Sequence, residues 1–249
     1  MCDKRHDHSA LLSVLSRQLH DDGYDNVSHE EAWRDSLHDT IIYVQQAEGC
    51  ELVIKEHRPD NPLKKALLTP DDWKLLRQCP CAVLMVKSER PWTGGRILAA
   101  VDVGNQDEDH RRLHASIIDH GHDIAALAKG ELHVISAHPS PMLSAADPVY
   151  QLSETIEARY REACEAFQAE YGISEDRLHV AEGPADVLIP HTEQRLDAVV
   201  TVIGTVCRTG ITGALIGNTA EVVLDELKGD VLVLKLEETS TKLAERVRG

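Results

Sequence analysis

The second part of the chain alternates between apolar runs and segments with helical periodicity. Two stretches, ILAAVD at residues 97–102 and AVVTVI at 198–203, are continuous apolar runs, as expected for strands buried on both faces of a parallel sheet. The full pattern predicts strands at 97–102, 131–137, 177–181, 198–203 and 231–235, and helices at 107–129, 151–171, 184–195 and 218–228. Strands that alternate with helices of this length indicate βαβ units, so we predict an α/β fold with a parallel sheet.

The chain also repeats itself. Residues 67–87 (LLTPDDWKLLRQCPCAVLMVK) align without a gap with residues 215–235 (LIGNTAEVVLDELKGDVLVLK). Further upstream, residues 50–56 match residues 197–204 in position and pattern. Each copy contains a helix start, an apolar-periodic helix, a short turn and a β-branched run that ends in lysine. This self-similarity indicates two homologous halves.

The first half is shorter than the second. Its pattern predicts helices at about 9–22, 36–48 and 70–78 and strands at about 26–33, 51–55 and 82–87. The first strand, first helix and second strand of the complete half therefore have no counterpart in it. We expect an incomplete domain over 1–90 and a complete domain over 96–238, joined by the linker Ser88–Gly95, which contains proline and glycine. The sheet edge left open by the missing strands should promote association of copies of the chain.

Composition and charge narrow the class of partner. Hydrophobic residues make up 42% of the 249 residues but aromatic residues only 4%, so the core must be aliphatic. The net charge of −16 argues against nucleic acid as a partner, because the phosphate backbone would repel the surface. No apolar run approaches the ~20 residues of a membrane span, so no membrane partner is expected. With six cysteines and no secretion signal, we expect a cytoplasmic protein with reduced thiols.

The densest glycine cluster follows the predicted strand 198–203 and leads into the helix at 218–228. Glycines allow close approach of the backbone, and the free N–H groups of a helix start attract anions. The candidate ligand-binding residues in this cluster are Gly204, Thr205, Cys207, Arg208, Gly217, Asn218 and Thr219. Among these, Arg208 would neutralise the anion, and Asn218 or Thr219 could cap the helix or donate to a phosphate. The alternative interpretation is a glycine-rich connection with no ligand.

This cluster resembles the universal stress protein family. That family's signature is a strand, G-x2-G-x9-G-[ST], a helix and a strand, and this chain reads Gly204-x2-Cys207-x9-Gly217-Asn218. The stretches GTVCRTGITGALIGNTAE and TPDDWKLLRQCPCAVLMVK look like the tandem-domain E-type members. The resemblance implies two tandem domains, each with an open parallel sheet of strand order 3-2-1-4-5, the first domain being incomplete. It also implies binding of a small molecule, often an adenine nucleotide, at the second domain's glycine loop.

Two positions depart from the family pattern. Cys207 stands where the loop has its second glycine, and Asn218 stands where nucleotide-binding members have Ser or Thr. In the first half the equivalent positions are Thr69 and Pro70, without any glycine. We therefore expect one competent crevice, in the second domain, for an anionic and nucleotide-like molecule. ATP or another adenine nucleotide is the candidate ligand.

The resemblance also brings Asp102 and Gly104 into the candidate site. Asp102 ends the first strand of the complete domain and is followed by Val103-Gly104-Asn105. In the implied strand order, strands one and four lie side by side at the switch point, where open parallel sheets bind ligands. Asp102 would then face the Gly204 loop. His138 would line the same rim, and the alternative interpretation, which we favour, is a solvated loop histidine. The alternative interpretation is an aspartate that caps the following helix. The two halves should pair as a pseudo-dimer through the terminal strands 83–87 and 231–235.

The sequence contains no nucleophile elbow and no metal-hydrolase signature, so we expect binding and signalling without enzymatic turnover. Two alternatives stay open. The first is a weak metal-assisted nucleotide hydrolase that uses His110 and His114 with Asp107, and the second is an interaction scaffold without ligand. The pair Cys79-Pro80-Cys81 suggests redox work, but it opens an apolar strand and is interpreted as core. Cys207, near a helix start, is a candidate for a thiol of lowered pKa.

Overall fold

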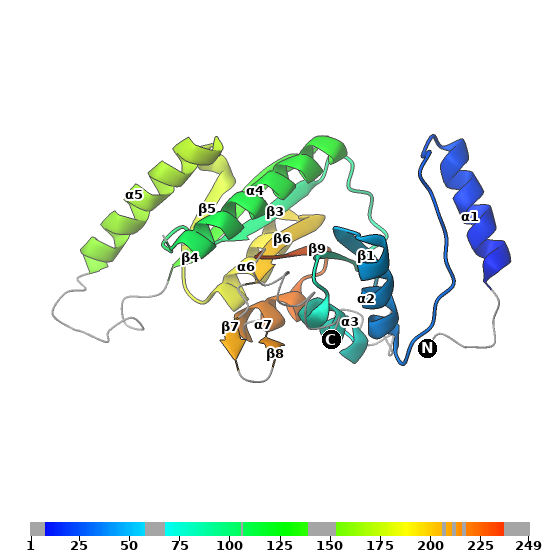
Figure 1. Ribbon diagram of the computed structural model, residues 1–249. Helices are drawn as coiled ribbons and strands as arrows, with labels where there is room; N and C mark the ends of the chain where they lie inside the picture. The colour runs from blue at the N-terminus through cyan, green and yellow to red at the C-terminus, as the bar shows by residue number, and fades with distance from the viewer. Residues whose placement is uncertain are drawn as a thin grey trace. The chain divides into compact units, whose positions relative to one another are not determined.

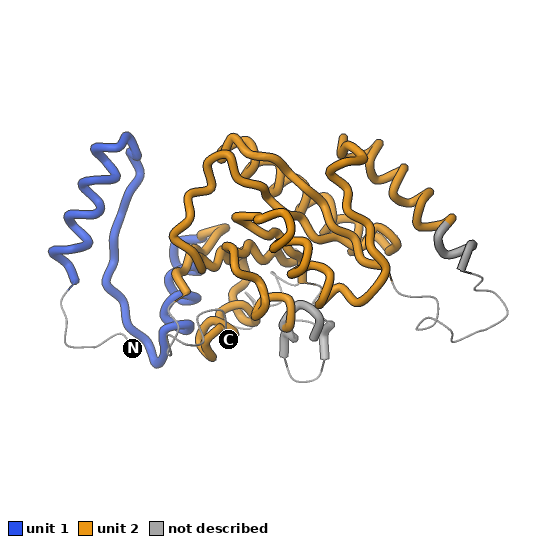
Figure 2. The backbone as a smooth tube through the Cα atoms, turned by 180° about the vertical axis from the view of Figure 1, so that it is seen from behind, with its two compact units in different colours: residues 1–49 blue, residues 50–249 orange. Residues whose placement is uncertain are grey.

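The computed structural model describes residues 8–57, 68–105, 107–138, 153–205, 208–210, 213–215 and 218–236. The chain forms two compact units, residues 1–49 and residues 50–249 (Figure 2). The second unit therefore contains the strands of both sequence halves, while the first contains only helices among its described residues.

The first unit consists of α1 (Ser9–Asp21) and α2 (Leu37–Glu48). The α2 helix begins where the Ser36 side chain accepts a hydrogen bond from the Asp39 amide, and it ends at Gly49, whose φ of 67° is left-handed and favours glycine. The α1 helix has no buried residue, and its apolar positions Leu11 and Leu15 are exposed.

The predicted strand at 26–33 is wrong. This segment has no regular secondary structure. Its sequence NVSHEEAW offers a single β-branched residue, Val27, and the described part of this unit contains no strand with which it could pair. The helices predicted on either side, at 9–22 and 36–48, are confirmed.

The second unit is built on one seven-stranded sheet (Figure 1). In spatial order its strands are β1 (Leu52–Glu56), β2 (Ala82–Val86), β9 (Asp230–Lys235), β6 (Val200–Thr205), β3 (Arg96–Val101), β4 (Glu131–His138) and β5 (Leu178–Glu182). All neighbours are parallel except β2 and β9, which are antiparallel. The second half thus supplies β5-β4-β3-β6-β9, which confirms the expected order 3-2-1-4-5.

Helices cover both faces of this sheet. They are α3 (Pro70–Gln78), α4 (Glu108–Ala128), α5 (Ser153–Tyr171), α6 (Ala185–Leu196) and α7 (Asn218–Glu226), with a 3-10 turn, η2, at Glu175–Arg177. Alternate residues of β3 point to opposite faces: Ile97 belongs to the core cluster under α4, and Leu98 to a second cluster with Leu196 of α6. The sheet is therefore doubly wound, as the continuous apolar runs predicted. A short hairpin, β7 (Arg208–Gly210) with β8 (Gly213–Leu215), lies between β6 and α7 and was not predicted.

The two halves join through β2 and β9, which confirms the predicted pairing of the terminal strands. Leu84 pairs with Leu232, and these two residues are equivalent in the alignment of 67–87 with 215–235. On either side, Val83 pairs with Val233 and Met85 with Val231. Because each strand meets its own equivalent about a central pair, the junction has the self-complementary geometry of a two-fold interface.

The linker between the halves is anchored on one buried carboxylate. Asp230, only 2% exposed, begins β9 and accepts three hydrogen bonds. The amides of Lys87 and Ser88 donate to its Oδ1 at 2.8 and 2.9 Å, and the Trp92 indole N–H donates to its Oδ2 at 2.8 Å. Three donors on one carboxylate satisfy it away from water and fix the path of the chain out of β2.

Candidate ligand crevice

The structure brings Asp102 and Gly204 to the same edge of the sheet. The strands β3 and β6 are parallel neighbours, with Ala100 opposite Ile203. Asp102 follows the last residue of β3, and Gly204 lies next to Ile203 within β6. β3 lies between β4 and β6 in the sheet. The chain goes from β3 to β4 on one side, whereas β6, which comes later in the sequence, lies on the other side. The ends of β3 and β6 therefore form the switch point of the doubly wound sheet.

Tyr160, which the sequence reasoning missed, closes over Asp102 and Gly104. Its hydroxyl donates to Asp102 Oδ1 at 2.9 Å, and its ring lies 4.9 Å from the ring of His138, centroid to centroid. A Cβ on Gly104 would lie 2.6 Å from the Tyr160 Cε2 and Oη atoms, so only glycine permits this approach. Burial, followed by the charge and hydrogen bond of Asp102, raises the pKa of Tyr160, which keeps the phenol protonated as a donor.

The turn after β3 is held by hydrogen bonds from its own amides. The amide of Asp102 donates to His114 Nε2 at 3.2 Å, and that of Val103 donates to Ser136 Oγ at 3.2 Å. The amide of Gly104 donates to Asp102 Oδ1, also at 3.2 Å. These bonds tie the turn to α4 and β4 and orient the Asp102 carboxylate.

His114 is part of this support. Because its Nε2 accepts an N–H, that nitrogen carries no proton, and burial lowers the pKa of the ring. The nearby His110 places its Nδ1 2.7 Å from Asp107 Oδ2. Among the described residues, no three His, Cys, Asp or Glu side chains gather into a group that could hold a metal ion.

Gly204 and Thr205 both have packing roles. A Cβ on Gly204 would lie 2.5 Å from Leu113 Cδ2, so glycine lets α4 pack directly on β6. The Thr205 side chain is buried, and its hydroxyl donates to the Leu234 carbonyl of β9 at 3.3 Å. A ligand at this edge would therefore meet the backbone of Thr205 rather than its hydroxyl.

The remaining predicted residues belong to the connection between β6 and α7. Cys207 and Gly217 lie outside the described residues. Arg208 begins β7, and Asn218 and Thr219 begin α7, but the side chains of these three also lie outside the description. The backbone shows that α7 begins at Asn218, at the end of this connection, which is where the sequence predicted the helix start.

The equivalent helix start in the first half holds a carboxylate of its own. Asp72, fully buried, accepts hydrogen bonds from Lys55 Nζ at 2.5 Å and from the Thr69 amide at 2.9 Å, and lies 2.8 Å from His57 Nδ1. Burial raises the pKa of Asp72, but these hydrogen bonds outweigh it and hold the pKa below its ordinary value. At the start of α3 an internal aspartate thus takes the place that an anion would take.

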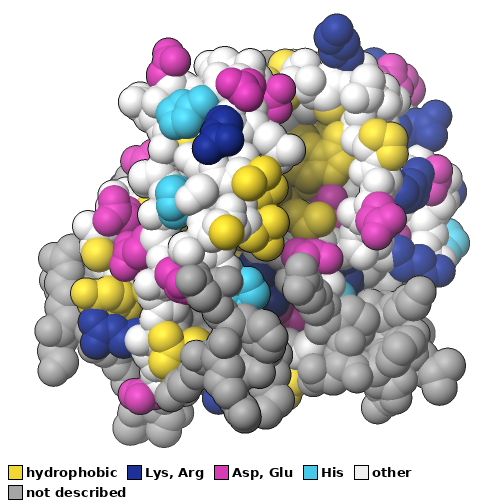
Figure 3. Space-filling view, turned by 90° about the vertical axis from the view of Figure 1, so that its right-hand side faces the viewer, with side chains coloured by type: hydrophobic (Ala, Val, Ile, Leu, Met, Phe, Trp, Pro, Cys, Tyr) yellow, Lys and Arg dark blue, Asp and Glu magenta, His cyan; other side chains and the backbone are white. Residues whose placement is uncertain are grey.

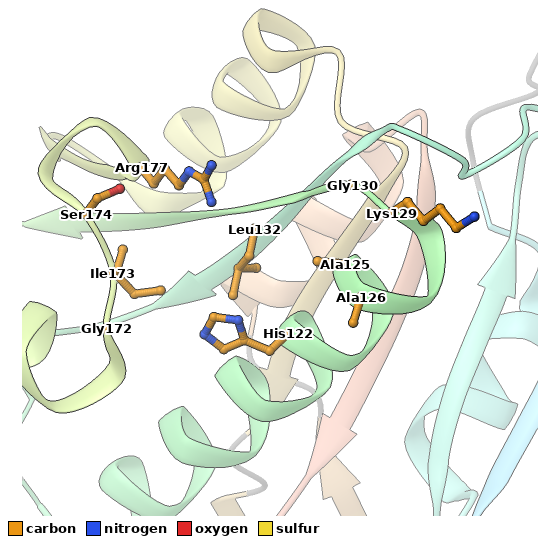
Figure 4. A pocket seen from close by; sticks show the side chains of 10 residues that line it. All are labelled: His122, Ala125, Ala126, Lys129, Gly130, Leu132, Gly172, Ile173, Ser174 and Arg177. Atoms are coloured by element: carbon orange, nitrogen blue, oxygen red, sulfur yellow. The ribbon is translucent and has the colours of Figure 1, made fainter.

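A separate cavity of about 320 Å³ lies at the other end of the strands (Figure 4). It is lined by His122, Ala125, Ala126, Lys129, Gly130, Leu132, Gly172, Ile173, Ser174 and Arg177. Figure 4 shows His122 pointing toward Ile173, whereas the Lys129 side chain points away from the other lining residues. None of the residues predicted for the ligand site lines this cavity.

Comparison with known proteins agrees with this architecture. The model of the universal stress protein family matches residues 4–87 and 95–235. Universal stress protein E of Escherichia coli K12 is 34% identical over 218 residues, which cover 84% of this chain and 68% of that protein. The Haemophilus influenzae homologue of universal stress protein E is 32% identical over 209 residues, covering 82% of this chain and 68% of the homologue.

Solved structures agree as well. A crystal structure from Pseudomonas aeruginosa UCBPP-PA14, described as a universal stress protein, has 66% identity and a TM-score of 0.91 and covers 99% of this chain and 85% of its own. A universal stress protein from Archaeoglobus fulgidus shares the fold, with a TM-score of 0.65 at 19% identity, over 92% of this chain and 77% of its own. The chain belongs to the universal stress protein family.

Proposed function

We propose that this protein acts in stress adaptation by binding an anionic, nucleotide-like small molecule in the crevice of its second half. The proposed site consists of Asp102, Gly104, Gly204, Thr205, Cys207, Arg208, Gly217, Asn218 and Thr219. The proposal includes an incomplete domain over 1–90, a complete domain over 96–238, a cytoplasmic location and binding without turnover.

One observation carries the proposal. Asp102 directly follows β3 and Gly204 lies in the adjacent parallel strand β6 at the switch point, and the chain runs from Gly204 through a glycine-rich connection into the start of α7. Helix starts of this kind accept anions through free backbone N–H groups. Because Asp72 occupies the corresponding place in the first half, we assign the external anion to the second half.

The surface favours a small ligand over a nucleic acid. The net charge is −16, and Figure 3 shows acidic and basic side chains interspersed over one face of the molecule. In the described part of the chain, no helix is long and apolar enough to cross a membrane.

The first test is native mass spectrometry of freshly purified protein, followed by denaturation and identification of any released molecule. Titration with ATP and Mg²⁺ then measures affinity directly. We expect a bound or bindable adenine nucleotide, no steady-state phosphate release, and loss of binding in Gly217→Val and Asp102→Asn. Leu127→Ala, at a position 86% exposed, is the control and should bind as the wild type does.

Two outcomes would contradict the proposal. A wild-type protein that carries no small molecule and does not bind ATP would favour an interaction scaffold. Unchanged affinity in a folded Gly217→Val variant would remove the glycine connection from the site.

We also propose that copies of the chain associate through β1. This strand forms one edge of the sheet among the described strands, and its Ile54 side chain is 64% exposed. Ile54→Lys should lower the sedimentation coefficient of an associated wild type, and a wild type that is monomeric at high concentration would contradict this part.

A further inference from the structure

Two cysteine sulfurs meet at the junction between the halves. Cys79 follows α3 as its C-terminal cap, and Cys81 precedes β2, with one proline between them. Their Sγ atoms lie 3.6 Å apart. Cys79 is fully buried, whereas Cys81 is partly exposed and places its Sγ 3.3 Å from the Ala82 carbonyl oxygen.

The surroundings favour one thiolate shared between the two sulfurs. The hydrogen bond from Cys81 lowers the pKa of Cys79 to about 7 against the opposing effect of burial, and the charge of Lys235 contributes. The same hydrogen bond, together with burial, raises the pKa of Cys81. Lys235 comes from the other half, where its ammonium donates to the Cys79 carbonyl.

We propose that Cys79 and Cys81 form a reactive dithiol whose substrates are low-molecular-weight disulfides such as oxidised glutathione. The assignment rests on the distance between the sulfurs and on their unequal exposure. It does not depend on a ligand in the proposed crevice, although the pair lies at the same edge of the sheet: Lys235, which contacts Cys79, is the strand partner of Thr205.

The exchange proceeds in two steps. Cys81, the partly exposed cysteine, passes its proton to the Cys79 thiolate and attacks one sulfur of glutathione disulfide, so that a mixed disulfide forms and one glutathione thiolate leaves. Cys79 then loses its proton to that thiolate or to water and attacks Cys81 Sγ, which forms the Cys79–Cys81 disulfide and expels the second glutathione. Two protein thiols are oxidised, and one glutathione disulfide is reduced to two thiols.

The position of each sulfur suits its step. The first attack is assigned to Cys81, because it is the partly exposed cysteine of the pair and Cys79 is fully buried. The second needs only a thiolate within reach of Cys81 from the protein side, which the buried Cys79 supplies. Because Cys81 is open to solvent, we expect the disulfide to be reversible in a glutathione buffer.

The test uses the full chain, reduced and then equilibrated without oxygen in buffers of increasing oxidised-to-reduced glutathione ratio. After acid quenching, tryptic digestion releases residues 78–87, which contain both cysteines in one peptide. We expect this peptide to lose two hydrogens with increasing ratio and to regain them when excess reduced glutathione is added.

Single variants distinguish the two roles. Cys79→Ser should trap a stable glutathione adduct on Cys81, because the resolving thiol is absent. Cys81→Ser should leave Cys79 unmodified under the same conditions. Cys50→Ser removes an exposed cysteine outside the pair and should form the disulfide as the wild type does.

A measurement on the wild type covers the case in which a variant fails to fold. Phenylarsine oxide bridges closely spaced thiols, so one equivalent should protect both cysteines of the 78–87 peptide from iodoacetamide. The proposal is overturned if no ratio produces the intrapeptide disulfide, if folded Cys79→Ser accumulates no adduct, or if the arsenical fails to protect the pair.

Discussion

Lys87 and Lys235 are equivalent residues of the two halves, and each donates its ammonium to a helix end in the other half. Lys87, after β2, donates to the Leu224 carbonyl at 3.0 Å and to the Leu227 carbonyl, both at the end of α7. Lys235, at the end of β9, donates to the Cys79 carbonyl at the end of α3. Cys79 and Leu227 are themselves aligned, so the exchange is reciprocal.

This exchange extends the two-fold relation of the β2–β9 pair to the helices beside it. The last carbonyls of a helix have no partner within the helix and carry partial negative charge, and a lysine ammonium satisfies both needs. The first half, although it lacks three elements, is therefore joined to the second by main-chain pairing and by charge.

The first prediction concerns the pH dependence that Lys87 causes. Burial lowers the pKa of Lys87 to about 8, although Asp225, Glu193, Asp72 and Asp230 oppose the shift. The unfolded chain holds the proton up to the ordinary value of 10.5, so between these values it binds more protons than the native state. The free energy of unfolding should therefore rise with pH over this window.

Chemical denaturation at pH 7.5 to pH 10 measures this slope. In Lys87→Met the free energy of unfolding should rise less steeply with pH than in the wild type, because the titration of Lys87 is removed. Lys74→Met, which changes an exposed lysine of α3, should keep the wild-type slope. An identical slope in the wild type and Lys87→Met would show that Lys87 titrates alike in the folded and unfolded states.

The second prediction concerns Asp230. Asp230→Ala leaves the amides of Lys87 and Ser88 and the indole N–H of Trp92 without their acceptor. We expect a loss of about 2–4 kcal/mol in the free energy of unfolding, since buried donors that lose a charged acceptor are costly. Arg90→Ala is the control: it breaks a bidentate ion pair with Asp197 at the surface and should leave the free energy of unfolding nearly unchanged. Equal losses in urea titrations would contradict the prediction.

The third prediction concerns Gly104 and Tyr160. In Gly104→Ala the new methyl group overlaps the Tyr160 ring, which must swing away and give up its hydrogen bond to Asp102. We expect a loss of about 1–3 kcal/mol. In a Tyr160→Ala background the same substitution should be nearly neutral, because the atoms it would overlap are gone. A double-mutant cycle from thermal denaturation measures this coupling, and additive losses would contradict it.

Local pattern predicted most of the fold. The central strands β3 and β6 are continuous apolar runs because they are buried on both faces, and the repeat of 67–87 in 215–235 indicated the pairing of β2 with β9. The hairpin β7–β8 was missed because its three-residue strands lie in a glycine-rich stretch too short to show periodicity.

The crevice was less predictable from the sequence. Asp102 and Gly104 were proposed because they lie at or just after the end of a predicted strand. Tyr160 was not, because its contact with them joins α5 to a turn 56 residues away from it and no local pattern encodes that distance. Gly204 was interpreted as a position of ligand approach, and the structure adds a packing reason, the contact of Leu113 with β6. Cys79 is a buried core residue, as predicted. Cys81 is partly exposed and its sulfur lies 3.6 Å from that of Cys79, so the pair also has the geometry of a dithiol.

The last prediction concerns a pair of histidines on adjacent strands. His133 Nδ1 of β4 lies 3.1 Å from His179 Nε2 of β5, and the rings are stacked. Arg195 donates to His179 Nδ1 at 3.2 Å. Because arginine can only donate, His179 must carry its proton on Nε2 and donate it to His133 Nδ1. Both rings are therefore neutral in the folded state.

Acid should destabilise the protein through this pair. Burial lowers the pKa of both His133 and His179 in the folded state, while the unfolded chain titrates near the ordinary value of 6.5. The charged groups around the pair are Arg96, Glu131, Asp176, Arg177 and Arg195. The stabilisation is complete above pH 6.5 and is lost as the pH falls below it, because the unfolded state then binds more protons.

Urea denaturation between pH 7.5 and pH 5 should show a shallower pH dependence in His133→Gln than in the wild type. His122→Gln, which replaces an exposed histidine of α4, should retain the wild-type dependence, and a His133→Gln curve parallel to the wild type would contradict the assignment.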